Sequence, residues 1–501
     1  MMPSSLVVLP VLIPILTSTS ALVRYRVARR VLVLTGLTLN LIACLALLTH
    51  TQTSGPLVTQ MAGHPAPFGI SLVADALTAI MLTITAIISV AVAVFSYATI
   101  DANRERFAYY PMLALLVLGI NFAFLTGDVF TLYVAFEVML MSSFVLLTLG
   151  GERSQIGGGL KYVALNLMSS TVFLIAAAMT YGVAGTLNMA ELSQRLSGLE
   201  APGITTVLAV LYLTAFGIKA GIFPLFFWLP ASYHTPPIAV TAIFGALLTK
   251  VGIYSMWRVI GLLFPQEIGF LQPLIFTLAG ATMITGVLGA IAQMEVRRLL
   301  SFHIISQIGY LVMGFGLFNV VGITASVFFM VHVILAKTAL FLISGIAYKS
   351  EGTYWLKKLG GLQRSNPFLA FLFLCAAMSL AGMPPFAGFW AKLALIQAGL
   401  EAQQYGIVAV AIFTSILTLF SMIKIWNEAF WKKGSTAPAR EVARPLVRTA
   451  LYAPTIALVA LIILIGVLVE PMYQMAQRAA EGLVERANYT TAVLVNGEAG
   501  E

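Results

Sequence analysis

The chain is poor in charged residues and in cysteine. Only 9% of its 501 residues are Asp, Glu, Lys or Arg, whereas 60% are hydrophobic. A soluble domain carries about 25% charged residues, so this composition excludes a water-soluble protein and indicates a polytopic membrane protein. The two cysteines, Cys44 and Cys375, both lie in apolar runs, which excludes a disulfide framework and a cysteine-based metal site.

Cofactor motifs are missing as well. The sequence has no nucleotide-binding glycine motif, no cysteine cluster and no pair of histidines suited to haem. We therefore expect no cofactor, no bound metal and no redox enzyme in its own right. The net charge of +9 does not indicate a nucleic-acid-binding surface, because the Lys and Arg residues of membrane proteins gather in cytoplasmic loops.

The N-terminus lacks a basic residue before its first apolar run, and its arginines follow that run. A secretory signal peptide has the opposite order. We therefore interpret residues 4–23 as a retained first span whose N-terminus lies outside.

Long apolar runs fill most of the chain. A membrane-spanning helix needs about 20 mostly apolar residues, and continuous runs favour helices over the alternating pattern of a barrel. The predicted fold is an all-α polytopic membrane protein of about 14 transmembrane helices. The predicted spans are residues 4–23, 31–49, 70–99, 108–126, 128–149, 160–185, 203–229, 237–264, 268–294, 299–318, 319–348, 367–400, 404–430 and 450–469.

The loops predict the orientation. Odd-numbered loops hold most of the 28 Lys and Arg residues, whereas the even-numbered loops hold only Arg195. By the positive-inside rule the odd loops are cytoplasmic and both termini lie outside. The tail after Val469 is polar, and we interpret it as a surface segment that could act as a docking arm.

Several ionisable residues lie near the middle of predicted spans. A charge at the bilayer centre costs about 2.5–3.5 kcal/mol even on a lenient scale, and one acid cannot neutralise four lysines. Some lysines must then be hydrated or neutral part of the time, which is what a proton relay needs; the alternative is a set of buried ion pairs that only lock helices together. The residues are Glu137, Lys219, Lys250, His332, Lys337 and Lys392.

Other charges lie nearer the ends of spans. Arg258 and Lys424 are placed where long side chains can reach water. Lys424 and Glu428 are four residues apart and could pair on one helix face, either as a stabilising pair at the cytoplasmic end or as groups for proton entry. Asp75, near the outer end of the third span, is interpreted as structural.

The histidines leave alternatives open. His332 and Lys337 are five residues apart, which places them about 140° apart on an ideal helix. They would converge only if the helix were locally widened, as in a π-bulge. His234 and His303 are either proton-uptake groups or polar fillers.

Two spans contain helix breakers beside a lysine. Pro224 follows Lys219 in the seventh span, and Pro384 and Pro385 precede Lys392 in the twelfth. Interrupted helices in corresponding halves indicate inverted repeats with a midplane ion site, here two inverted five-helix repeats built from spans 4–8 and 9–13. The predicted divisions are residues 1–107, 108–264, 265–430 and 431–501.

Several segments resemble one known family. They are "FEVMLMSSFVLL", "VAGTLNMAEL", "GIKAGIFPLFFWLPASYHTPP", "LLSFHIISQIGYLVMGFG" and "LAGMPPFAGFWAK". They are similar to the antiporter-like family, which includes the proton-pumping membrane subunits of respiratory complex I and the large subunits of Mrp-type multisubunit Na⁺/H⁺ antiporters. The resemblance covers spans 3 to 13.

The resemblance implies a fold, roles and partners. The fold implied is fourteen helices with two inverted five-helix repeats. Glu137 matches the family's glutamate that pairs with the lysine matching Lys219, and Lys250 matches the central lysine. His332 and Lys337 match the histidine or lysine of helix 11, and Lys392 matches the ion-exit residue. Implied partners are a large A subunit and small membrane subunits of an Mrp-type complex, protons and Na⁺, in a bacterial inner membrane.

Three hypotheses remain open from the sequence. The first is the proton-translocating subunit of a cation/proton antiporter. The second is a proton-pumping subunit of a complex I-like or membrane-hydrogenase redox complex, in which the path is the same and the energy source differs. The third is a membrane scaffold without transport, in which neutralising the mid-span charges harms assembly and leaves ion flux unchanged.

Overall fold

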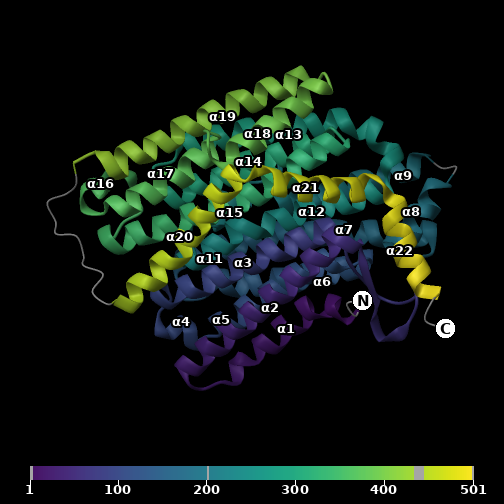
Figure 1. Cartoon of the computed structure of the whole chain (residues 1–501), viewed down its shortest axis with the longest axis horizontal. Coiled ribbons are helices and arrows are strands. Elements are labelled where there is room, and N and C mark those ends of the chain that lie inside the picture. The colour runs from purple at the N-terminus through teal and green to yellow at the C-terminus, as the bar shows by residue number, and fades with distance from the viewer. Residues whose placement is uncertain (1–3, 200–201, 434–444, 499–501) are drawn as a thin grey trace.

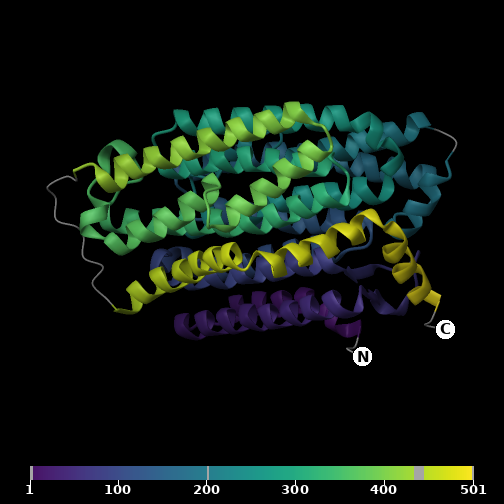
Figure 2. The ribbon, with the colours of Figure 1, turned by 45° about the horizontal axis from the view of Figure 1, so that its top comes forward.

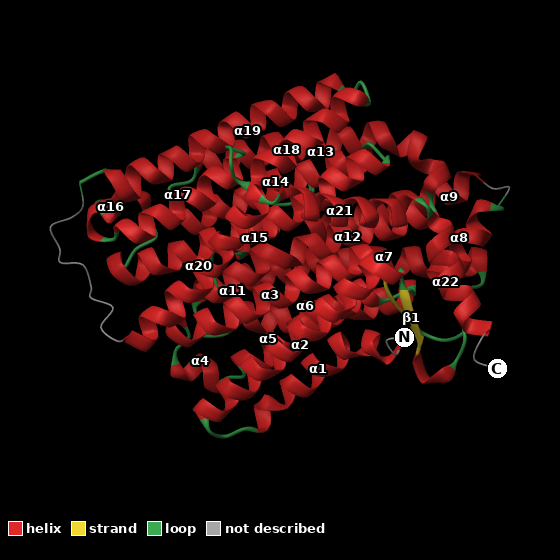
Figure 3. Cartoon of the chain, viewed as in Figure 1, coloured by secondary structure: helices red, strands yellow, loops and turns green. Residues whose placement is uncertain are grey.

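The structure, a computed structural model, describes residues 4–199, 202–433 and 445–498 and is almost entirely helical (Figures 1 and 3). Within these residues, twelve helices are long and apolar enough to cross a membrane. Two shorter apolar helices, Tyr109–Leu125 and Pro367–Ala381, lie among them. Figure 2 shows the long helices running side by side, with the purple N-terminal pair at one edge of the bundle. The predicted all-α polytopic membrane fold is confirmed.

The first half of the chain forms the elements up to α12. They are η1 (Ser4–Val8), α1 (Leu9–Ser18), η2 (Thr19–Leu22), α2 (Arg26–Ser54), β1 (Leu57–Gln60), η3 (Met61–Gly63), β2 (Ser71–Ala74), α3 (Ala76–Thr99), α4 (Ala102–Arg106), α5 (Tyr109–Leu125), α6 (Val129–Thr148), α7 (Arg153–Ala184), α8 (Met189–Ser197), α9 (Pro202–Ala220), α10 (Trp228–Ser232), α11 (Ile238–Ile243), the π-helical η4 (Phe244–Leu248) and α12 (Thr249–Leu263).

The second half continues the bundle and closes it. Its elements are η5 (Pro265–Glu267), α13 (Ile268–Ala292), α14 (Val296–Gly316), α15 (Val320–Glu351), η6 (Leu356–Lys358), α16 (Leu362–Ser365), α17 (Pro367–Ala381), α18 (Ala387–Glu401), α19 (Tyr405–Ile425), the π-helical η7 (Trp426–Trp431), α20 (Pro445–Val467), α21 (Val469–Val484) and α22 (Arg486–Glu498).

Each predicted span overlaps at least one of the helices, but some ends were wrong. The second span was predicted at residues 31–49, whereas α2 runs from Arg26 to Ser54. The third was predicted to begin at residue 70, whereas β1 and β2 form an antiparallel hairpin there, with Leu57 opposite Ala74, and α3 begins at Ala76. The number of membrane crossings, the inverted repeats and the four divisions of the chain stay predictions.

Both predicted helix breaks are present. α9 ends at Ala220, and Gly221 follows with a φ of 77° that a side chain with a Cβ rarely adopts. The freed backbone is held from outside the helix, since the N–H of Phe223 donates to Thr282 Oγ1 of α13 at 2.9 Å. α17 ends at Ala381, and Gly382, with a φ of 88°, turns the chain toward α18.

Two of the helices that carry mid-span charges lie at the centre. The most apolar stretches of the segment Ile238–Leu263 and of α15 are completely buried, whereas only 33% of that of α2 is buried. In Figure 1, α12 and α15 lie inside the bundle while α1 and α2 form its lower edge. Charged groups on α12 and α15 are therefore enclosed by protein.

The C-terminal tail is a pair of helices rather than a plain polar segment. α21 packs on α3, α12 and α15, and α22 reaches α8 and β1, as the yellow ribbon shows in Figures 1 and 2. Met472, Ala476 and Leu483 are buried on one face of α21, while Arg478 is exposed on the other. The tail is thus an amphipathic strap across the bundle.

Candidate functional site

Lys219 lies at the broken end of α9. It is 3% exposed, and its Nζ has no hydrogen-bond partner among the described residues. It lies 5.4 Å from the ring centroid of Phe136, and its charge interacts with that of Glu137, the next residue on α6. Glu137 Oε1 is also buried without a partner, and no ion pair within 4.0 Å joins the two charges. Glu137 and Lys219 are therefore close enough for their charges to interact, but more than 4.0 Å apart, so they form no ion pair.

α12 packs directly against this break. A Cβ on Gly252 would lie 2.7 Å from the backbone nitrogen of Ala220. Only glycine allows so close an approach of the two helices, because any side chain would meet backbone. The approach places the break near the segment of α12 that carries Lys250.

Lys250 follows the π-helical segment η4. A π-helix leaves carbonyls without their usual i→i−4 partners, and Lys250 Nζ donates to the carbonyl of Gly245 inside η4 at 2.9 Å. The side chain is completely buried. The widened turn thus supplies a neutral acceptor to a cation that has no carboxylate beside it.

His332 and Lys337 do not converge. α15 is a regular α-helix from Val320 to Glu351, without the local widening that convergence required. Lys337 Nζ donates to the carbonyl of Leu300 on α14 at 3.3 Å, whereas His332 Nδ1 lies 3.4 Å from Ser379 Oγ on α17. The two groups face different neighbours of the same helix.

Lys392 lies beside the second break. Its Nζ donates to the carbonyl of Ala381, the last residue of α17, at 3.1 Å and to Ser415 Oγ at 3.0 Å. Ser415 in turn donates to the same carbonyl at 2.9 Å. Lys250 and Lys392 therefore both donate to a carbonyl at a helix irregularity, one inside the π-helical η4 and one at the end of α17.

The buried cations influence one another. The charge on Lys337 interacts with those on Lys250 and Lys392, and His332 interacts with Lys337 and Lys392. By the predicted divisions, Lys219 and Lys250 belong to the first repeat, and Lys337 and Lys392 belong to the second. Glu137 and Lys219 lie on α6 and α9 and interact with each other.

Serine hydroxyls complete the surroundings, and sequence reasoning missed them. Ser379 and Ser415 contact His332 and Lys392, and Ser421 bonds to Nε2 of His303. Serine is frequent in membrane helices for many reasons, so no spacing in the sequence marks these serines. Only their positions across helix contacts identify them.

Two expectations about charges near helix ends were wrong. Arg258 does not extend to water: it is 3% exposed and pairs with Asp75 at 2.7 Å, with the ring of Tyr489 5.0 Å away. The pair forms because Asp75 caps α3 beside α12, accepting the N–H of Thr78 at 2.8 Å.

The second concerns Lys424 and Glu428. Glu428 pairs with Lys432 at 3.1 Å, while Lys424 Nζ donates to the carbonyls of Ile291 and Gln293 at the end of α13. The π-helical η7 begins at Trp426, between the two residues, and changes the regular four-residue register.

A polar cavity of about 490 Å³ opens where the loops predicted to be cytoplasmic meet. Its lining includes Arg104 paired with Glu152 at 2.5 Å, Arg297 paired with Glu295 at 2.8 Å, and His234. We call this cavity the vestibule. It reaches Ile238, the first residue of α11, whose helix continues through η4 to Lys250.

His234 is a titratable group of the vestibule whose pKa is shifted by its surroundings. Burial lowers its pKa below the usual 6.5, and Arg297 and Arg298 add to this, while Glu295 opposes it. Its Nδ1 lies 2.9 Å from the carbonyl of Pro230. The imidazole is therefore uncharged at neutral pH and able to accept a proton.

The chain matches a family of membrane proteins over more than half of its length. The family described as NADH:quinone oxidoreductase/Mrp antiporter, transmembrane, matches residues 126–418. The chain belongs to this family. It is 42% identical to the D subunit of the Na⁺/H⁺ antiporter of Alkalihalophilus pseudofirmus, over 98% of this chain and 99% of that protein.

Two solved complexes contain chains with the same fold. A chain of the Mrp complex from Dietzia sp. is 33% identical, with a TM-score of 0.91 over 99% of this chain and 100% of that one. A chain of the membrane-bound sulfane sulfur reductase, an archaeal respiratory membrane complex, is 25% identical, with a TM-score of 0.89 over 98% and 99%. Relatives of this chain are thus parts of multisubunit membrane complexes.

Proposed function

We propose that the chain is the proton-translocating subunit of a multisubunit Na⁺/H⁺ antiporter. The similarity to the D subunit of such an antiporter, over nearly the whole chain, supports this assignment. The distribution of Lys and Arg supports a bacterial inner-membrane location with cytoplasmic odd-numbered loops and both termini outside.

One observation carries the proposal. Among the described residues, none of the ammonium groups of Lys219, Lys250, Lys337 and Lys392 has a carboxylate within 4.0 Å, although all four are buried. Buried cations that serve only stability are paired, since an unpaired buried charge is strongly destabilising. Lysines held by neutral carbonyls and hydroxyls can instead lose and regain a proton, as a relay requires.

The geometry supports a path with three parts. Protons enter from the vestibule, where His234 accepts them, and reach the region of Lys219 and Lys250. They cross through Lys337, which interacts with cations on both sides. They leave near Lys392, where the break between α17 and α18 opens the helix.

The separation of Glu137 and Lys219 suggests that this pair is the gate of the proton path. When the two groups approach, the carboxylate stabilises the charged lysine and holds its proton; when they separate, the lysine releases it. Na⁺ is expected to use a partner, the large A subunit or a small membrane subunit, because lysines do not coordinate a cation.

Charge removal at this pair tests the proposal. Glu137→Gln or Lys219→Ala should abolish Na⁺-dependent proton movement in vesicles while the complex still assembles, because either change removes the interaction that sets the lysine's protonation. The exposed Glu401→Gln is the matched control and should keep wild-type transport. Normal antiport in either site variant would contradict the proposal. Failed assembly of the complex in both variants would favour a membrane scaffold without transport.

A redox-driven pump is the second candidate. The likeness to a chain of a sulfur-reducing respiratory complex favours it, since that fold serves an electron-transfer assembly. Purification of the tagged chain from its own host in mild detergent separates the two. Small multi-span membrane subunits as companions support the antiporter, whereas flavin or iron–sulfur proteins in fixed ratio would replace it with the redox pump.

A further inference from the structure

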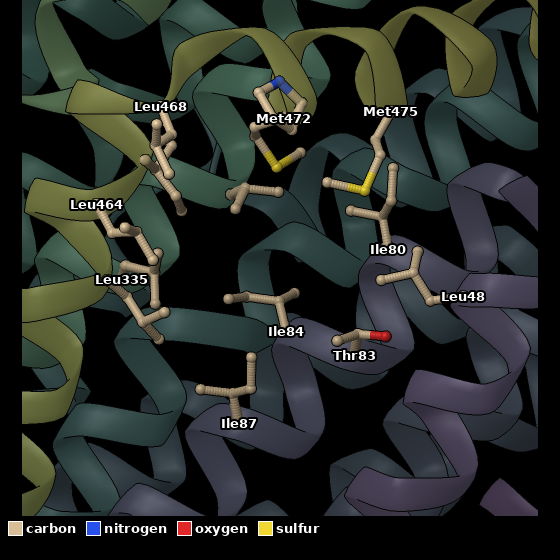
Figure 4. A pocket seen from close by; sticks show the side chains of 14 residues that line it. Leu48, Ile80, Thr83, Ile84, Ile87, Leu335, Leu464, Leu468, Met472 and Met475 are labelled. Carbon is tan, nitrogen blue, oxygen red and sulfur yellow. The ribbon is translucent and has the colours of Figure 1, made fainter.

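A second cavity, of about 280 Å³, has none of the buried lysines in its lining (Figure 4). It is enclosed by α2, α3, α15, α20 and α21, and its lining is almost wholly apolar. Its one hydroxyl, on Thr83, already donates to the carbonyl of Cys44 at 3.2 Å. Water would find no partners there, so the cavity suits an apolar occupant.

The cavity is open on one side and elongated along the helices. Leu464 of α20 and Leu468, which joins α20 to α21, line it yet remain 51% and 55% exposed, so this wall lies at the surface of the bundle. The lining runs over residues 80–87 of α3 and over residues 461–468 at the end of α20, about 10 Å along each. Met472 and Met475 of α21 close one end, as Figure 4 shows.

The chemistry of the groove indicates its occupant. The walls are aliphatic and offer no free polar partner, and the groove opens at the exposed Leu464 and Leu468 on the surface of the bundle. In an apolar groove that opens between membrane-spanning helices, a lipid acyl chain matches this elongated shape and this chemistry.

The closed end carries groups suited to a lipid phosphate. Arg478 follows Met475 by one turn of α21, and Gln52 follows Leu48 by one turn of α2, so both lie just beyond the lining. Arg478 is exposed and donates to the carbonyl of Gln52 at 2.6 Å. Gln52 Nε2 is buried without a partner. An anionic oxygen of a lipid headgroup could accept hydrogen bonds from both the Arg478 guanidinium and Gln52 Nε2.

We propose that this cavity binds one phospholipid, with an acyl chain between α3 and α20 and its phosphate at Arg478 and Gln52. The bound chain packs against Val331 and Leu335, which flank His332 on α15. The lipid would therefore separate α15, the buried helix that carries His332 and Lys337, from the bulk bilayer. This site is independent of the direction or energy source of transport.

Photo-crosslinking in the intact complex tests the site. The probe is phosphatidylglycerol with a diazirine in the middle of one acyl chain, followed by peptide mapping. We expect label concentrated on residues 80–87 and 461–468, above the level on the exposed face of α19. Equal labelling of all exposed helices would show bulk lipid contact and overturn the proposal, as would a crosslink from this groove to another subunit.

Two matched pairs of variants sharpen the test. Leu464→Trp should fill the groove and lose the label, whereas Leu39→Trp, equally 51% exposed on α2 but outside the cavity, should keep it. Arg478→Gln should reduce the labelling and Arg478→Lys should restore it, because a cation remains for the phosphate. Unchanged labelling in Leu464→Trp would overturn acyl-chain binding, and unchanged labelling in Arg478→Gln would overturn the headgroup assignment.

Discussion

At the scale of the residue, the buried cations of this protein are held in two contrasting ways. Arg258 has a carboxylate partner, Asp75, and fixes α12 to the start of α3. Lys250 and Lys392 have only carbonyl and hydroxyl partners. Arginine stays charged in proteins, whereas lysine can become neutral. The pairing therefore follows the chemistry: the permanent cation is neutralised and the titratable ones are not.

The Asp75–Arg258 pair should act as a structural lock. Arg258→Met leaves a buried carboxylate unpaired, so we expect a loss of about 3–5 kcal/mol in the free energy of unfolding. Thermal unfolding of the purified chain measures it. The double variant with Asp75→Asn should recover part of the loss, because no uncompensated charge remains. Strictly additive losses would contradict a direct pair.

His234 should make stability depend on pH. Its pKa in the folded protein lies below 6.5, so the unfolded chain binds the proton more readily. Its contribution is complete above pH 6.5 and is lost as the pH falls below that value toward the folded pKa. We expect His234→Gln to flatten the fall of the unfolding temperature in this range. The exposed His64→Gln is the control, and an unchanged slope in His234→Gln would refute the assignment.

At the scale of the element, the break between α17 and α18 depends on close backbone packing. A Cβ on Gly388 would lie 1.8 Å from the carbonyl oxygen of Ser379 and 2.6 Å from His332 Nε2. The glycine lets α18 fold back over the end of α17 and lets the imidazole of α15 approach. A side chain here must displace one or the other.

Gly388→Ala should therefore destabilise the protein by about 1–3 kcal/mol through overpacking. Thermal unfolding in detergent measures the change. Gly182→Ala, on α7 with nothing within 4 Å of the added Cβ, is the control. It should be neutral or stabilising by up to about 1 kcal/mol, because alanine favours the helix. Equal changes in stability for the two variants would show that α18 does not pack closely against Ser379 and His332 at Gly388.

The two breaks were predictable from sequence, and the π-helical segments were not. Pro224 and the Pro384–Pro385 pair interrupt helical bonding wherever they lie, so local chemistry decides the outcome. η4 contains only Phe, Gly, Ala and Leu, all compatible with an ordinary α-helix. Its widening depends on tertiary packing, which no single segment of the sequence records.

At the scale of the whole molecule, the apolar runs predicted the bundle well, because membrane-spanning helices must satisfy their own backbone bonds. Contacts between segments that lie far apart in the sequence could not be predicted as well. The pairing of Asp75 with Arg258 and the packing of α21 on α15 join parts of the chain far apart in sequence. The hydrogen bond from Lys337 Nζ to the carbonyl of Leu300 on α14 likewise emerged only from the folded arrangement.

The most direct test of the account is proton movement through Lys337 in a defined membrane. The purified complex is placed in liposomes containing a pH-sensitive dye, and a Na⁺ gradient is imposed without an electron donor. We expect the wild type and Lys161→Met, an exposed control, to move protons, and Lys337→Met to move none although the complex remains assembled. Proton movement at the wild-type rate in Lys337→Met, or none in the wild type, would contradict a gradient-driven path along the buried lysines.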